Sequence, residues 1–96
     1  MFIVLLHYVK PLEIIDSLIP AHVAYLEEQY QAGVFVASGR RIPRTGGVIL
    51  AKAATRTDLD AILAQDPFAQ HAAATYEVVE FSPSKSSPDL ACLLEG

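Results

Sequence analysis

The chain opens with the run Phe2-Ile3-Val4-Leu5-Leu6-His7-Tyr8-Val9, which Lys10-Pro11 closes. The run is rich in β-branched and aromatic residues, so it predicts a β-strand that is buried on both faces. Side chains alternate between the two faces of a strand, and both faces are apolar here except at His7. One face can pack on helices of the same chain. The other needs a different cover, which predicts a homodimer.

The period of the apolar residues becomes helical over residues 11–32. Pro20 lacks an N–H and disfavours helix in the residue before it. We therefore expect a short turn over 12–18, then the main helix with Pro20 in its first turn and Gly33 as its stop. His22 would then lie near the start of that helix.

The remaining elements form a simple series. They are a strand at 34–38, a basic turn at 39–45, a strand at 48–53, a helix at 59–65 with Thr57 as N-cap, and a last strand at 76–81. The order predicts an α+β, ferredoxin-like βαββαβ fold, with a four-stranded antiparallel sheet and its helices on one face. One domain would span 1–82. Residues 83–96 would form a C-terminal tail whose apolar part could pack on the partner subunit.

Composition limits the functions open to the chain. With 96 residues, 52% of them hydrophobic, it makes one domain with a thin core, and part of the apolar surface is expected at a subunit interface. A net charge of -4 argues against nucleic acid. No run approaches the roughly 20 apolar residues of a membrane span, and no positively charged leader is present. The single cysteine, Cys92, excludes an internal disulfide and is usual for a cytoplasmic protein.

His22 and Asp66 are the candidate catalytic pair, because the predicted fold can bring them together. A carboxylate orients an imidazole and tunes it for proton transfer. Each residue also has a plainer interpretation. His22 can be an exposed helical histidine, and Asp66 before Pro67 is typical of an N-cap with proline at the first helical position. Capping and catalysis can coexist at Asp66.

Four further residues are candidates for substrate binding. His7 faces a pocket or is a hydrogen-bonded core histidine, and burial habits favour the core. Ser38 and Gly39 end a predicted strand and either contact a ligand or begin the turn. Arg40, with two neighbouring arginines, forms an anion-binding rim or is only solvated. Metal-ligand spacings and a phosphate-binding loop are absent from the sequence, so we expect neither a metal nor a cofactor.

Six runs resemble the YciI-like (YCII-related) family of the dimeric α+β barrel superfamily. They are residues 2–6, Pro20-Ala21-His22 with Tyr25-Leu26, Ala32-Gly33-Val34 with Ala37-Ser38-Gly39, residues 43–50, Asp66-Pro67-Phe68, and residues 76–81. The likeness covers nearly all of the chain except the tail. It implies a ferredoxin-like monomer, a dimer with sheets packed face to face, and an active site whose His and Asp map onto His22 and Asp66. Residues 70–73 depart from the family pattern.

The family resemblance also implies an enzyme, because relatives include a chloromuconolactone dehalogenase and the superfamily includes muconolactone isomerases. Our leading hypothesis is general acid/base chemistry by His22 and Asp66 on a small lactone- or carboxylate-like substrate, of the lyase, isomerase or dehalogenase type. His7, Ser38 and Arg40 would contribute to the pocket. The alternatives are a non-catalytic dimeric module that binds a small ligand, and a purely structural oligomer.

Overall fold

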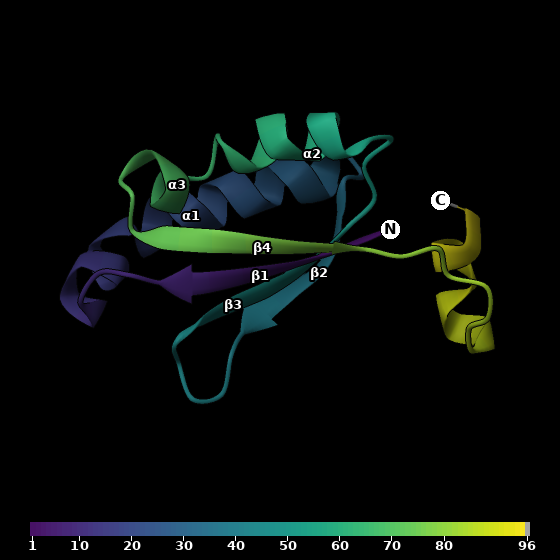
Figure 1. Cartoon of the computed structure of the whole chain (residues 1–96), viewed down its shortest axis with the longest axis horizontal. Helices are drawn as coiled ribbons and strands as arrows, with labels where there is room; N and C mark the ends of the chain where they lie inside the picture. The colour runs from purple at the N-terminus through teal and green to yellow at the C-terminus, as the bar shows by residue number, and fades with distance from the viewer. Residues whose placement is uncertain (96) are drawn as a thin grey trace.

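A four-stranded antiparallel sheet with strand order β2-β3-β1-β4 organises the computed structural model, which describes residues 1–95. The elements follow one another as β1 (Phe2–Tyr8), α1 (Leu12–Gln31), β2 (Phe35–Arg40), β3 (Gly46–Ala51), α2 (Arg56–Leu63), α3 (Pro67–Gln70), β4 (Ala74–Glu80) and the 3-10 helix η1 (Pro88–Glu95) (Figure 1). The predicted α+β, ferredoxin-like fold is confirmed.

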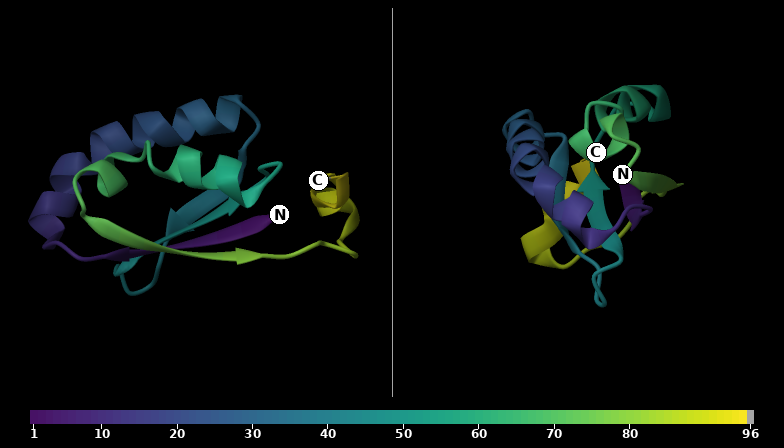
Figure 2. Two further views of the ribbon diagram at one scale, coloured as in Figure 1. Left: turned by 45° about the horizontal axis from the view of Figure 1, so that its top comes forward. Right: turned by 90° about the vertical axis from the view of Figure 1, so that its left-hand side faces the viewer.

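The three α-helices lie on one face of the sheet, as the views of Figure 2 agree (Figure 2). The core lies between these two layers. It includes Phe2, Val4 and Leu6 of β1, which are almost fully buried, while the residues between them are only partly buried. The two faces of β1 therefore differ within one chain, because only one of them meets the helices.

α1 is one continuous helix with Pro20 inside it, so the expected division into a turn and a later helix is wrong. The helix carries buried side chains on both sides of the proline, Ile15 and Tyr25, and their packing offsets the loss of one backbone hydrogen bond. Gly33 follows the helix at φ +76°, the left-handed conformation that commonly stops a helix. His22 is consequently in the middle of α1 and not near its start.

The β2–β3 hairpin is longer than expected, because Gly39 and Arg40 belong to β2 and β3 begins at Gly46. A Cβ at Gly46 would lie 1.7 Å from the carbonyl oxygen of Leu6 in β1. Only glycine therefore allows β3 and β1 to approach each other at this point. Glycine at this position looks like a turn residue in the sequence. It is instead a strand residue at a close backbone contact.

α2 begins after Thr55 rather than Thr57, so the predicted N-cap is wrong by two residues. The Thr55 hydroxyl accepts a hydrogen bond from the backbone N–H of Asp58 at 3.1 Å. After β4 the chain runs to η1, which lies beyond the end of β4 and away from the three α-helices (Figure 1). Lys52 Nζ donates to the carbonyl oxygen of Cys92 at 3.0 Å and ties η1 to the loop after β3. Among the described residues no helix is long and apolar enough to cross a membrane.

Candidate active site

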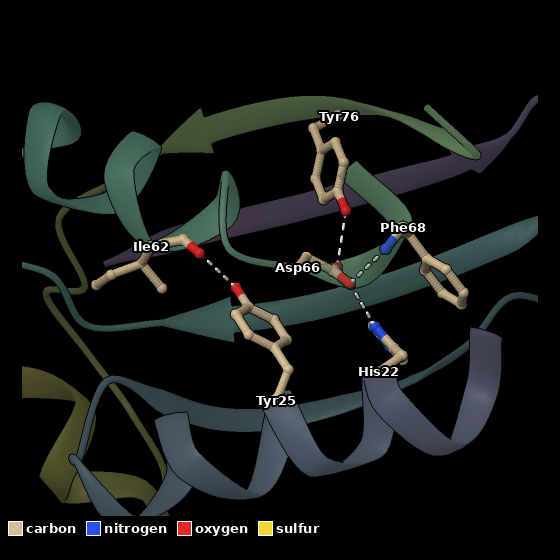
Figure 3. A network of polar contacts seen from close by, with 6 residues as sticks. All are labelled: His22, Tyr25, Ile62, Asp66, Phe68 and Tyr76. Carbon is tan, nitrogen blue, oxygen red and sulfur yellow. Dashed lines mark hydrogen bonds and ion pairs between the residues drawn. The ribbon is translucent and has the colours of Figure 1, made fainter. Parts of the chain in front are cut away.

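His22 and Asp66 are in direct contact, although 44 positions separate them in the sequence. His22 projects from the middle of α1 toward the turn that precedes α3, where Asp66 lies (Figure 3). The distance from His22 Nδ1 to Asp66 Oδ1 is 2.8 Å. The Asp66 side chain is 0% exposed and that of His22 is 12% exposed. The fold thus makes the contact that the sequence analysis anticipated.

Asp66 is the N-cap of α3, so its plainer interpretation is also confirmed. Its Oδ1 accepts the backbone N–H of Phe68 at 3.0 Å, and Pro67 follows at the first helical position. Its Oδ2 accepts the Tyr76 hydroxyl at 2.7 Å. Because a backbone N–H and a phenol hydroxyl donate to the carboxylate, its ionised, acceptor form fits the site. The Nδ1–H of the His22 ring donates to this carboxylate in either protonation state of the ring.

The ring of His22 is held from a second direction by Phe68. The two rings are stacked, with centroids 4.1 Å apart and planes inclined by 16°. Phe68 is itself 1% exposed and closely packed in the core, so its contact restricts the orientation of the imidazole. Nε2 has no hydrogen-bond partner in residues 1–95. Every buried side-chain nitrogen or oxygen of the described residues has a hydrogen-bond partner. Since Nε2 has no partner, it is accessible to solvent.

Two tyrosines complete the polar surroundings. Burial, and then the charge of Asp66, raise the pKa of the Tyr76 hydroxyl well above its usual value, and its hydrogen bond to Asp66 raises it further. Burial and Asp66 likewise raise the pKa of Tyr25, whose hydroxyl donates to the carbonyl oxygen of Ile62 at 2.9 Å. Both phenols therefore stay protonated, and Tyr76 stays a donor, throughout the physiological pH range.

A cleft of about 230 Å³ lies beside His22, between α1 and the sheet. Its walls are mostly apolar, and its polar side chains are His22 on α1, Tyr8 on β1, and Ser38 and Arg40 at the end of β2. The lining residues are Leu6, Tyr8, Ile19, His22, Leu26, Ser38, Gly39, Arg40, Gly47, Val48, Ile49 and Phe68. The structure therefore brings Ser38, Gly39 and Arg40 to the same cleft as His22. The Ser38 hydroxyl is hydrogen-bonded to that of Tyr30 on α1.

His7 lies elsewhere, because it projects from the opposite face of the sheet. Its Nδ1 accepts a hydrogen bond from Arg41 at 2.8 Å, and its Nε2 lies 3.7 Å from Glu77 Oε2. The His7 side chain is 41% exposed, so the expectation of a core histidine is wrong for the single chain. His7 is not among the residues that line the cleft. Arg44, the third arginine of the hairpin, pairs with Asp16 at the surface.

Sequence reasoning missed the contributions of Phe68 and Tyr76. The alternation of β4 places Tyr76 on the same face as Val78, toward the helices. The sequence alone could therefore have predicted the direction of the Tyr76 side chain. It could not identify the acceptor of the hydroxyl, because that depends on how α3 packs. No cluster of three or more potential metal-ligating side chains occurs in the part of the chain that the structure describes.

Comparisons with known proteins agree with this architecture. A family model described as the YCII-related domain matches residues 1–82. A solved structure of 5-chloro-2-hydroxyhydroquinone dehydrochlorinase from Burkholderia phenoliruptrix, in complex with 2,5-dihydroxybenzoquinone, superposes with a TM-score of 0.71 at 18% identity. The superposition covers 85% of this chain and 94% of the other, and at this identity it demonstrates a shared fold. The comparison with curated protein sequences found no match.

Proposed function

The chain belongs to the YCII-related family, and from this premise we propose that it is an enzyme in which His22 acts as general acid and base on a small organic substrate. The observation that carries the proposal is the placement of the two ring nitrogens of His22. Nδ1 is bonded to a fully buried carboxylate, while Nε2 is free beside a cleft. A base held in this way can accept a proton from a bound molecule.

The proposed chemistry is proton transfer coupled to elimination or isomerisation. His22 Nε2 takes a proton from a C–H or O–H of the substrate, and the released electron pair moves into the substrate, where it forms an enolate or expels a leaving group. Asp66 stabilises the imidazolium that forms. The imidazolium then returns the proton to another substrate atom or to the leaving group. General acid/base catalysis of this kind contributes about 10²- to 10⁴-fold in rate.

The cleft favours a substrate with a single ring. Its volume of about 230 Å³ is smaller than the roughly 300–1,000 Å³ of sites for drug-sized ligands. Apolar walls suit the ring, while Ser38 and Arg40 offer donors to oxygen substituents at one end. Arg40 forms no ion pair within residues 1–95, which leaves its guanidinium for an anionic group. The related dehydrochlorinase was solved with a dihydroxybenzoquinone, also a single ring with oxygen substituents. These features support a lactone- or carboxylate-like substrate.

We further propose that the protein is a homodimer built on the uncovered face of the sheet. In that face Ile3 pairs with Leu50 on one side and with Val79 on the other, and Val79 is 45% exposed. A contiguous aliphatic surface of this kind is typical of an interface. The tail would pack on the partner, since Leu90 in η1 is 50% exposed. The exposed free thiol of Cys92 suits the reducing cytoplasm.

The test is a search for turnover with a matched pair of histidine variants. Lactones, hydroxyquinones and halogenated ring acids are incubated with the protein, and products are identified by mass spectrometry while thermal shift reports binding. We expect His22→Ala to lose at least about 10²-fold in kcat. His71→Ala is the control, because His71 is exposed and does not line the cleft.

The outcomes separate the two functional classes. Equal turnover in His22→Ala and the wild type would refute the proposal. Ligands that raise Tm across the whole panel without forming any product would support the non-catalytic binding module instead.

A further inference from the structure

Within residues 1–95, Tyr76 is the one side chain other than His22 that bonds to Asp66. Its hydroxyl comes from β4, on the side of the carboxylate opposite α1 (Figure 3). It bonds to Oδ2, whereas His22 and the backbone N–H of Phe68 both bond to Oδ1. Tyr76 is therefore the sole donor to Oδ2 in the described residues. Without its hydroxyl, one oxygen of a fully buried carboxylate would lack a partner.

We propose that Tyr76 is a positioning residue that determines the protonation state of the His22 ring before substrate binds. The Tyr76 hydroxyl completes the hydrogen bonds of Asp66, so that His22 rests as neutral imidazole with the Nε2 lone pair available to the cleft. The inference rests on the proposed function, since it states which form of His22 meets the substrate. It makes His22 a base in the first step of the reaction rather than an acid.

The physical reason is competition between two ways of stabilising a buried charge. A carboxylate without water needs hydrogen-bond donors or a cation. Three donors surround Asp66 here, and none of them has to be charged. If the Tyr76 hydroxyl were removed, the remaining charge on Asp66 would favour a second proton on His22. The imidazole would then be an imidazolium over a wider pH range, and Nε2 would be blocked by a proton.

The other charged or titratable groups near the ring are few. They are Tyr25 on α1, and Tyr8 and Arg40, which line the cleft from β1 and β2. Of these, Tyr25 offers a matched control. Its hydroxyl is also removed from water and also lies near Asp66, but it donates to the carbonyl oxygen of Ile62 and not to the carboxylate. Removing the Tyr25 hydroxyl perturbs the packing of the same region without changing the hydrogen bonds of Asp66.

The experiment is an NMR titration of the His22 ring in ¹⁵N-histidine-labelled protein, with the signals assigned through His22→Gln. At neutral pH we expect the wild type to have a protonated Nδ1 and an unprotonated Nε2. In Tyr76→Phe the titration midpoint of the ring should rise by about half a unit to one unit, because the carboxylate loses a charge-assisted hydrogen bond. In Tyr25→Phe it should stay at the wild-type value.

A second variant keeps the test open if Tyr76→Phe does not fold. 3-Fluorotyrosine at position 76 is nearly isosteric and is a stronger donor, so it should move the midpoint of His22 downward. An unchanged or lowered midpoint in Tyr76→Phe, or a shift of equal size in Tyr25→Phe, would overturn the inference, as would an unchanged midpoint with fluorotyrosine. None of these measurements needs a substrate. Their failure is therefore distinct from a failure to find turnover.

Discussion

Two substitutions of Asp66, to alanine and to asparagine, should distinguish what its charge and its hydrogen bonds contribute to the free energy of unfolding. Asp66→Ala removes the acceptor of three donors, namely the Phe68 backbone N–H, the Tyr76 hydroxyl and the His22 ring N–H. Loss of the helix cap costs about 1 kcal/mol. Each buried donor left without a partner costs about 1–3 kcal/mol, less where water can enter. We expect the free energy of unfolding to fall by about 3–5 kcal/mol, the usual cost of removing one partner from a buried pair.

Asp66→Asn should cost much less, about 1–2 kcal/mol, because its carbonyl can accept from His22 and Phe68 while Tyr76 turns to accept from the amide. Urea unfolding at pH 7.5, followed by circular dichroism, measures both variants. With a slope of about 1.5 kcal/mol per M, Asp66→Ala should lower the midpoint by about 2–3 M. Asp16→Ala is the control, because its pair with Arg44 is exposed and screened by solvent, so its loss should hardly change the midpoint. Equal losses in the alanine and asparagine variants would refute this account of the site.

Two further predictions concern the rest of the molecule. Because the pKa of Tyr25 is raised in the folded protein, its phenol ionises near pH 10 only in the unfolded chain. The contribution of the protonated phenol to stability is therefore intact below pH 10 and is lost progressively above it. Tyr25→Phe should therefore lose less stability than the wild type between pH 10 and pH 11, by up to about 1 kcal/mol after allowance for solvent screening, in parallel urea titrations. Leu5→Glu, on the uncovered face of β1, should convert the proposed dimer to a folded monomer in sedimentation velocity, and a wild type that is already monomeric would refute the proposed interface.

Local patterns in the sequence predicted those features that depend on local physics. The alternation along β1 correctly predicted two distinct faces, of which one packs on helices of the same chain, and the structure shows that this face carries Phe2, Val4 and Leu6. Asp66 before Pro67 correctly indicated an N-cap, because the cap and the first helical position are adjacent in the chain.

Features set by tertiary packing were the ones that the sequence analysis misjudged. Pro20 interrupts a helix by local rules, but buried contacts on both sides of it keep α1 continuous. His7 was assigned to the core on the burial habits of histidine, whereas the strand alternation puts it on the uncovered face beside Arg41. The bond from Tyr76 to Asp66 could not be foreseen, because it depends on the distance between β4 and the short α3.

The carboxylate of Asp66 therefore links three parts of the fold. Asp66 bonds to α1 through His22, to β4 through Tyr76 and to the first turn of α3. Any substitution in this network should cost stability as well as the proposed proton transfer. The opposite wall of the cleft is different, since Ser38 and Arg40 lie on β2, an edge strand whose outer residues are exposed. Exposed edge positions tolerate substitution at a cost of a few tenths of a kcal/mol. Differences in substrate preference should arise there, while the pair proposed to move the proton stays fixed by the fold.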